Sequence, residues 1–296
     1  MSLAPLEFLA PLELLELLEL LELLAPLELL ALLELLELLE LLEILSTNHY
    51  PLFTMKLLIT GAAKRIGSVI ARYFAEKGHA VVVHCNTSVK EAEALVASFP
   101  NPSLHSIIQM DLTKANAPSK LIRSLRNDPP DVLINNASVY SRISLKDTTP
   151  AIMQTALNIN FLIPFELMRC FYNEFKKGNI INILDHRVDH PDPASGPYAF
   201  AKKALKDATL ACALDFAPQC RVNGIAPAFV LPPDGVPLER MDRLIQSSPS
   251  RERPTPLHIA QAIDFILATS CLNGQIIYLS SGLHLSPSLA RERTNL

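Results

Sequence analysis

Several features that the sequence lacks narrow the class of protein. The 296 residues include five cysteines, an odd number without CxxC spacing, so we expect reduced thiols in a cytoplasmic protein rather than a disulfide framework. The chain has no Lys/Arg run of the kind typical of nucleic-acid binding. Glutamates interrupt the apolar runs of the first 45 residues, which argues against a membrane span or a signal peptide there. We therefore expect neither a nucleic-acid nor a membrane partner.

Basic residues are missing from the first 54 positions. That segment contains ten Glu and no Asp, Lys or Arg. All 26 Lys and Arg, and 20 of the 30 acidic residues, follow it, so the rest of the chain carries a net charge of +6. A moderately basic body suits an anionic cofactor or substrate.

Residues 1–45 are low-complexity APLE, LEL and LLE repeats. Glutamates that recur mainly every third residue drift around a helix and leave no constant apolar stripe. The segment is either a helical oligomerisation or interfacial element, or a translated nucleotide repeat upstream of a true start at Met55, which we favour. We therefore divide the chain into an extension with linker, residues 1–54, and a functional domain, residues 55–296.

The stretch Leu57–Gly67, LLITGAAKRIG, organises this domain. A short apolar run suits a buried parallel strand, and a helix-forming run follows from Arg65 to Glu76. Strand, glycine turn and helix together present free backbone N–H groups to a phosphate. Gly61 permits the tight turn, and Gly67 lets the helix approach the sheet. An ordinary turn is the alternative.

Further apolar runs alternate with helix-forming segments along the chain. We expect strands at 57–59, 79–85, 106–110, 131–135, 179–184, 221–225 and 275–279. We expect helices at 65–76, 89–98, 119–126 and 256–269. A long helix should start at Pro150, with Thr148 or Thr149 as its cap. A further helix, which carries Tyr198 and Lys202, should continue through residues 201–216.

Four motifs in this order resemble the short-chain dehydrogenase/reductase family. They are TGAAKRIG at 60–67, NNAS at 135–138, YAFAK at 198–202 and IAPA at 225–228. The variant of the first motif is similar to that of the pteridine reductase branch, which includes bacterial dihydromonapterin reductases. The chain departs from the family pattern in having Arg65 and Ala228 where glycines usually stand, and in lacking the Asp of a DGG motif at Ser280–Gly282. The resemblance covers residues 55–285 and implies one α/β domain, a Rossmann-type doubly wound sheet of seven parallel strands.

The end of the second strand bears on the choice of cofactor. A carboxylate there would bind the ribose of NAD and repel a 2′-phosphate, but the sequence continues Cys85-Asn-Thr-Ser. Asn86 and Ser88 can bind a phosphate, although a simple helix N-cap is the alternative, so we prefer NADPH. The resemblance implies cofactor contacts from Gly61, Lys64, Arg65, Ile66, Asn86, Thr87, Ser88, Asp111, Leu112, Asn136, Ala137, Ser138, Tyr198, Lys202, Pro227 and Ala228. For Asp111, a capping role is the alternative.

Tyr198 and Lys202 are four residues apart and share a helix face. A lysine ammonium beside a phenol favours the phenolate and lowers the pKa of the tyrosine, which suits proton transfer near neutral pH. A surface Tyr/Lys pair is the alternative. The resemblance adds that Lys202 binds the nicotinamide ribose. It also implies that the backbone carbonyl of Asn160 holds a water beside the lysine, whereas from the sequence alone a mid-helix Asn more often caps or hydrogen-bonds a neighbouring loop.

Asp185 is the clearest pointer to the substrate, with a stray capping Asp and no activity as the alternative. Most short-chain reductases have Ser at this position, whereas the pteridine reductases have Asp, which suits reduction of a ring C=N bond. The resemblance implies that a dihydropterin (dihydromonapterin, dihydrobiopterin or dihydrofolate) is reduced to its tetrahydro form. The pterin contacts would be Arg65, Ser138, Tyr140, Asp185 and Tyr198, with Tyr140 stacking on the ring. The rivals are a generic carbonyl reductase, such as a 3-oxoacyl thioester reductase, and a non-catalytic NADP-binding scaffold.

Three further expectations concern the second half of the domain. His186 and His190 lie four apart but between prolines and without a third ligand, so we expect no metal site. Residues 231–250 are expected to form a mobile substrate lid. The helices before and after the fifth strand form a four-helix contact in the family, which implies a homodimer or homotetramer.

Overall fold

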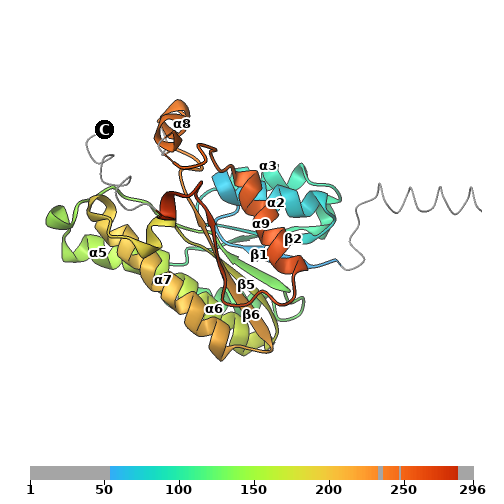
Figure 1. Cartoon of the computed structure of the whole chain (residues 1–296). Helices are drawn as coiled ribbons and strands as arrows, with labels where there is room; N and C mark the ends of the chain where they lie inside the picture. Colours follow the sequence, from blue (N-terminus) through green and yellow to red (C-terminus); the bar gives the residue numbers. More distant parts are fainter. Residues whose placement is uncertain (1–53, 233–235, 247, 286–296) are drawn as a thin grey trace, which may run out of the picture. The chain divides into compact units, whose positions relative to one another are not determined.

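The computed structural model describes residues 54–232, 236–246 and 248–285. They form a seven-stranded parallel sheet in the order β3-β2-β1-β4-β5-β6-β7 (Figure 1). The strands are β1 Lys56–Ile59, β2 Ala80–Cys85, β3 Ser106–Gln109, β4 Val132–Asn135, β5 Gly178–Ile183, β6 Cys220–Pro227 and β7 Ile276–Leu279. All seven predicted strands are confirmed to within two residues. The predicted extension lies outside the described residues, except for Thr54.

Helices cover both faces of the sheet, as the doubly wound prediction requires (Figure 1). Leu57 and Ile59 pack with one set of helices, and the intervening Leu58 packs with the other, because successive side chains of a strand point to opposite faces. The first set comprises α2 Arg65–Glu76, α3 Val89–Ala97 and α9 Pro256–Ala268. The second set comprises α4 Ala117–Ser124, α6 Ile163–Phe175 and α7 Gly196–Asp215.

The predicted long helix from Pro150 is interrupted. It consists of α5 Pro150–Leu157, a π-helical turn Asn158–Leu162 and α6. Thr149 is the cap, since its side chain accepts from the backbone N–H of Ile152 at 3.3 Å. The combined helix is apolar enough to span a membrane by length and composition, but its inward side chains belong to the core between the sheet and α4. π-helical turns are frequent at functional sites, and this one contains Asn160.

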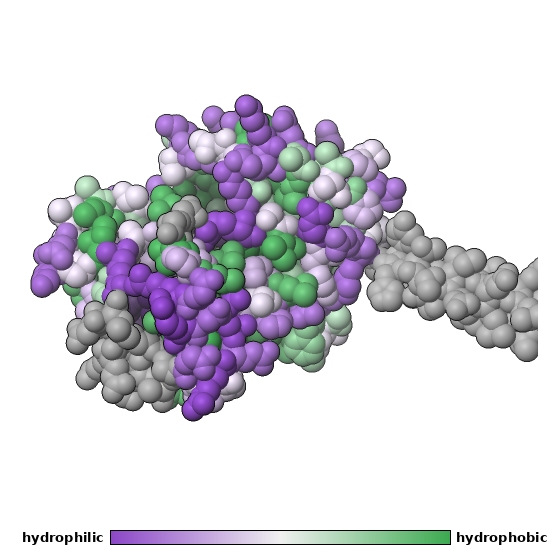
Figure 2. All heavy atoms as spheres, turned by 90° about the horizontal axis from the view of Figure 1, so that it is seen from above, coloured by the Kyte–Doolittle hydropathy of each residue, from purple (hydrophilic) through white to green (hydrophobic). Residues whose placement is uncertain are grey.

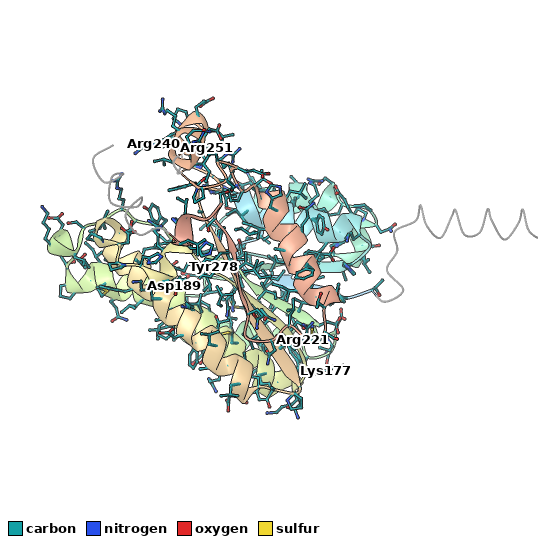
Figure 3. The ribbon with its side chains drawn as sticks, viewed as in Figure 1. Lys177, Asp189, Arg221, Arg240, Arg251 and Tyr278 are labelled. Carbon is teal, nitrogen blue, oxygen red and sulfur yellow. The ribbon has the colours of Figure 1, made fainter. Side chains whose placement is uncertain are left out.

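Two polar anchors hold the C-terminal third against the sheet. Arg221 on β6 donates to the carbonyls of Thr269 and Leu272 at 2.8 Å each, and to those of Ile266 and Leu267, which satisfies the end of α9. Tyr278 on β7 donates to Asp189, and the two side chains lie side by side in Figure 3. The segment predicted as a lid contains the short helix α8 Glu239–Ile245, while residues 233–235 and 247 lie outside the described part.

Candidate active site

The glycine turn after β1 has the backbone geometry that the sequence predicts. Gly61 has φ +63° and Arg65 has φ +56°, so both occupy the left-handed region that favours glycine. Arg65 stands where the family usually has its second glycine, and its φ gives the physical reason for that preference. A Cβ on Gly67 would lie 2.4 Å from the carbonyl oxygen of Gly61 and 2.6 Å from Nδ2 of Asn136. The predicted close approach of the helix is therefore confirmed.

Three side chains fasten this turn to the neighbouring strands. The Thr60 hydroxyl accepts from the backbone N–H groups of Asn136 and Ala137, at 3.0 Å each. The Asn136 amide donates to the carbonyls of Thr60 and Gly61, at 2.9 and 3.1 Å. His84, whose role no sequence motif signals, accepts from the Gly61 N–H at Nδ1 and contacts the Met110 carbonyl through Nε2 at 3.0 Å. Burial lowers the pKa of His84, so the imidazole is neutral in this arrangement.

The N-terminus of α2 and the end of β2 fit the phosphates of a dinucleotide. Lys64 occupies the N-cap position, where its ammonium cannot accept from the helix N–H groups, and it pairs with Glu91 at 2.5 Å. The first turn of α2 has no acidic residue, and helix N–H groups attract anions. At the end of β2, Asn86 and Thr87 are exposed, and the Ser88 hydroxyl makes no cap hydrogen bond within the described structure.

The other predicted cofactor residues lie along the same carboxyl edge of the sheet. Asp111 follows β3, and its carboxylate accepts from the backbone N–H and the hydroxyl of Thr113 at 3.0 and 2.6 Å, whereas Asn116 is the N-cap residue of the next helix, α4. Leu112 and Ala228 are buried, and Ala228 donates its N–H to Leu279 at 3.0 Å. Ile66 is half-buried in the first turn of α2, and Pro227 ends β6.

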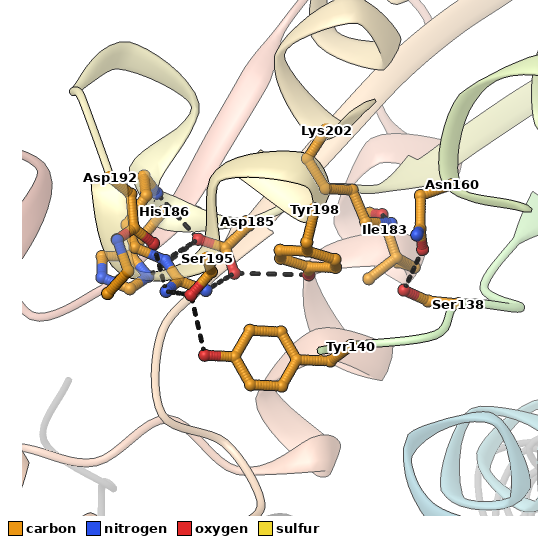
Figure 4. Close-up of polar contacts among 12 residues, drawn as sticks. Ser138, Tyr140, Asn160, Ile183, Asp185, His186, Asp192, Ser195, Tyr198 and Lys202 are labelled. Atoms are coloured by element: carbon orange, nitrogen blue, oxygen red, sulfur yellow. Dashed lines mark hydrogen bonds and ion pairs between the residues drawn. The ribbon is translucent and has the colours of Figure 1, made fainter. Parts of the chain in front are cut away.

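Asn160 supports the loop after β4 through its side chain. Its Oδ1 accepts from the Ser138 hydroxyl at 2.6 Å and from the Val139 N–H at 3.1 Å (Figure 4). Its Nδ2 donates to the carbonyls of Val139 and Ala156 at 3.0 and 3.1 Å. The residue is fully buried, so the contact with a neighbouring loop that the sequence alone suggests is present. The same loop contains Ser138, which bonds Asn160, and Tyr140, whose ring packs against Tyr198.

Tyr198, Lys202 and Asp185 come together at the end of β5 (Figure 4). The Tyr198 hydroxyl donates to Oδ2 of Asp185 at 3.3 Å. The Lys202 ammonium donates to the Ile183 carbonyl at 2.6 Å and lies 5.9 Å from the centre of the Tyr198 ring. Tyr198 and Lys202 are buried, with 7% and 3% of their surfaces exposed. The predicted sharing of one helix face is confirmed.

The expectation that Lys202 lowers the pKa of Tyr198 is wrong for this arrangement. Burial first, and then the charge and hydrogen bond of Asp185, hold the pKa of the Tyr198 phenol well above its ordinary value of 10.0. Burial also lowers the pKa of Lys202 from 10.5 to about 8. The sequence shows the spacing of the pair but not its desolvation, which disfavours both charged forms. Tyr198 is therefore a protonated donor.

Arg187 is a site residue that the sequence analysis missed. It follows β5 in a 3₁₀ turn, His186–Asp189, and its Nε and Nη2 donate to the two oxygens of Asp185 at 2.8 Å each. Its Nη1 donates to Asp192 at 2.7 Å and to Ser195 at 3.3 Å. Burial would raise the pKa of Asp185, but the charge and hydrogen bonds of Arg187 outweigh it and hold that pKa well below 3.8. The only available signal was an arginine two residues after the predicted Asp.

Tyr140 is in place to form one wall of the site. Its ring packs edge-on against that of Tyr198, with centroids 5.0 Å apart and planes at 89°, and its hydroxyl bonds Ser195 at 3.0 Å. Tyr140 remains 44% exposed, so it is accessible to a flat ligand. Arg65, also predicted to contact the substrate, donates instead to the Pro232 carbonyl at 2.6 Å.

The two histidines of the loop have other partners. Nδ1 of His186 lies 3.3 Å from Oδ1 of Asp185, without the alignment of a hydrogen bond. Nε2 of His190 contacts the carbonyl of His284. In the part of the chain that the structure describes, no group of three or more His, Cys, Asp or Glu side chains is arranged to hold a metal ion.

Comparison with known proteins supplies the family. The model of the family described as short chain dehydrogenase matches residues 56–240. The chain belongs to this family. It is therefore an oxidoreductase that uses a nicotinamide cofactor, built on the fold described above.

Individual relatives are distant and carry several names. A 2-dehydro-3-deoxy-D-gluconate 5-dehydrogenase of Formosa agariphila is 25% identical over 242 residues, covering 76% of this chain and 91% of its own length. A dihydromonapterin reductase of Citrobacter koseri is 24% identical, covering 78% of this chain and 97% of its own. The crystal structure of the alternative dihydrofolate reductase FolM from Brucella suis, in complex with NADP, has a TM-score of 0.73 at 28% identity and covers 78% of this chain and 96% of its own.

Proposed function

We propose that this short-chain dehydrogenase reduces a dihydropterin to its tetrahydro form with NADPH. The observation that carries the proposal is Asp185 at the end of β5, accepting the hydroxyl of Tyr198 beside the exposed ring of Tyr140. A carboxylate at this position cannot donate a hydrogen bond to a carbonyl oxygen as a serine hydroxyl does. It can orient a phenol that protonates a ring nitrogen. Relatives named dihydromonapterin reductase and FolM agree with this choice.

Tyr198, Asp185 and the predicted residues around them then have defined tasks in the reduction of a C=N bond. NADPH, when bound, supplies the hydride. Tyr198 is protonated and delivers the proton to the nitrogen, while Asp185 holds the hydroxyl in place. Tyr140 stacks on the flat ring, and Ser138, held by Asn160, lines the pocket. Lys202 binds the nicotinamide ribose and keeps a positive charge below pH about 8.

The preference for NADPH over NADH rests on the end of β2. The chain has Asn86, Thr87 and Ser88 there and no carboxylate to repel a 2′-phosphate. The Brucella suis structure that contains NADP agrees. We expect NADPH to bind at least about tenfold more tightly than NADH, as measured by fluorescence titration, and equal affinities would contradict the preference.

Oxidation of NADPH, followed by loss of its absorbance, tests the function. Residues 55–296 are assayed with dihydromonapterin, dihydrobiopterin and dihydrofolate, alongside a simple ketone and a 3-oxoacyl thioester. Turnover of a dihydropterin supports the proposal. Reduction of only the ketone or thioester would favour the generic carbonyl reductase, with which the relative named 2-dehydro-3-deoxy-D-gluconate 5-dehydrogenase agrees. NADPH binding without any turnover would favour the scaffold.

We also propose that the enzyme is a cytoplasmic homodimer or homotetramer. Apolar side chains remain exposed on α6 and α7, including Phe165, Leu210 and Leu214, the last with 85% of its surface exposed. Figure 2, which views the molecule from above relative to Figure 1, shows further apolar patches between hydrophilic residues. Light scattering coupled to size exclusion should give a multiple of the chain mass, and Leu214→Lys should lower it if the contact includes α7.

A further inference from the structure

The proposed reaction gives no task to Arg187, although this side chain has the most contacts among the charged groups of the site. Its guanidinium bonds Asp185, Asp192 and Ser195. It also lies over the rings of Tyr140 and Tyr198, with Cζ at 5.6 and 5.8 Å from their centres. Arg187 therefore contacts the acceptor Asp185, the proton donor Tyr198 and the predicted stacking ring of Tyr140.

The contacts of Arg187 occupy the carboxylate of Asp185. Oδ1 accepts from the Nε and the backbone N–H of Arg187, at 2.8 and 2.9 Å, and Oδ2 accepts from Nη2 of Arg187 and the Tyr198 hydroxyl, at 2.8 and 3.3 Å. A carboxylate has about four acceptor positions, and these four donors fill them. Asp185 thus has no position left for a ring N–H of the substrate.

We propose that Arg187 is a positioning residue: it fixes Asp185 as an ionised acceptor that aims the Tyr198 hydroxyl, and through Ser195 it fixes the ring of Tyr140. The link to Tyr140 is the chain Arg187 Nη1 to Ser195 Oγ, 3.3 Å, and Ser195 Oγ to the Tyr140 hydroxyl, 3.0 Å. This inference rests on the proposed function only for its effect on kcat in the reduction of a dihydropterin. Its effect on the pH dependence of stability can be measured on the protein without cofactor or substrate.

The charge balance explains why an arginine is required. Side chains of Asp185 and Asp192 are only 13% and 12% exposed, and a buried carboxylate without a partner is strongly disfavoured. Among the groups around Asp185, the arginine lowers the pKa of that carboxyl most, and the neighbouring His186 lowers it less. The Lys202 ammonium bonds the Ile183 carbonyl instead. The remaining titratable neighbours are His186 at 3.3 Å, Tyr198, and Tyr140 behind it.

The first test measures stability against pH without ligands. In the wild type, Asp185 has a pKa well below 3.8, so it is ionised in both folded and unfolded states above about pH 5 and contributes no slope there. In Arg187→Gln, burial without the cation raises the folded pKa above the unfolded value. The folded state then binds the extra proton, so the urea midpoint should fall as pH rises from about 5 to about 8. Asp185→Asn/Arg187→Gln should remove the share of that slope due to Asp185 and leave at most the share due to Asp192, the other buried carboxylate that loses the arginine.

Several outcomes decide the question. A pH slope for Arg187→Gln that matches the wild type would overturn the proposal, and so would a new slope that persists undiminished in the double variant. If Arg187→Gln is too unstable to purify, folding of the uncharged double variant supports the proposal, and its failure to fold overturns it. These measurements do not depend on which substrate the enzyme reduces.

The second test uses the conservative variant Arg187→Lys in the NADPH assay. Lysine keeps the charge but not the fork that engages both oxygens, so Asp185 should stay ionised while the Tyr198 hydroxyl loses its alignment. We expect kcat to fall by about a hundredfold, an unchanged KM for NADPH and no new pH slope in stability. A kcat equal to that of the wild type would overturn the positioning role. Absence of dihydropterin turnover by the wild type would instead count against the proposed function.

Discussion

Replacing Lys202 by methionine should stabilise the folded protein while it removes activity. The ammonium is buried, and burial lowers its pKa from 10.5 to about 8. Between these two values the unfolded chain binds more protons than the folded protein. The penalty for burying the charge is therefore fully present below pH about 8 and fades as pH rises toward 10.5.

The magnitude follows from the same pKa values. At about 1.4 kcal/mol per tenfold change, the drop from 10.5 to about 8 corresponds to about 3 kcal/mol at neutral pH and about 1 kcal/mol at about pH 10. Methionine has a similar length and no charge, but it leaves the Ile183 carbonyl without the 2.6 Å hydrogen bond, which costs about 1 kcal/mol. The net gain is about 2 kcal/mol near pH 7 and close to zero near pH 10.

Urea unfolding at both pH values measures this difference. Lys203→Met is the matched control, because Lys203 is the next residue on α7 and is only half-buried; it should change stability little at either pH. A Lys202→Met variant that is no more stable than the wild type at pH 7, or that remains more stable at pH 10, would contradict the effect of the buried charge. NADPH oxidation by the same variant should be lost.

Three further substitutions test other parts of the site. Asn160→Ala removes the anchor of the loop after β4 and should cost about 1–3 kcal/mol in urea unfolding and raise the KM for substrate; an unchanged KM would argue against the loop. Gly67→Ala places a Cβ 2.4 Å from the Gly61 carbonyl and should cost about 1–3 kcal/mol and weaken NADPH binding in a fluorescence titration, whereas wild-type affinity would show that the turn adapts. Alkaline absorbance titrations of the wild type and Tyr198→Phe should coincide up to pH 10, since Tyr198 ionises well above 10.0; a missing transition in the variant below that pH would contradict the protonated donor.

The fold and the catalytic pair were predictable because their signals are local. Short apolar strands, the glycine turn and the four-residue spacing of Tyr198 and Lys202 are each contained within a few consecutive residues. Parallel strands place their carboxyl ends at one edge of the sheet, so residues that follow different strands meet there. This rule brought Ser138 and Asp185 to one site.

The protonation states and the supporting contacts were not predictable in the same way. The pKa of Tyr198 depends on burial by α7 and the loop after β4, which spacing does not reveal. Arg187, Asp192 and Ser195 meet only because two 3₁₀ turns fold the segment after β5 back on itself. His84 reads as an ordinary strand residue, and its bond to the Gly61 amide depends on the pairing of β1 with β2.

In the proposed function, Asp185 adapts the site of this family to the reduction of a ring C=N bond. The most direct measurement compares the wild type with Asp185→Ser for NADPH-dependent reduction of a dihydropterin and of a ketone, with NADPH affinity as the control for folding. We expect dihydropterin turnover by the wild type, a loss of about a hundredfold or more in the variant, and unchanged NADPH affinity. Equal dihydropterin turnover by the two proteins, or a wild type that reduces only the ketone, would contradict it.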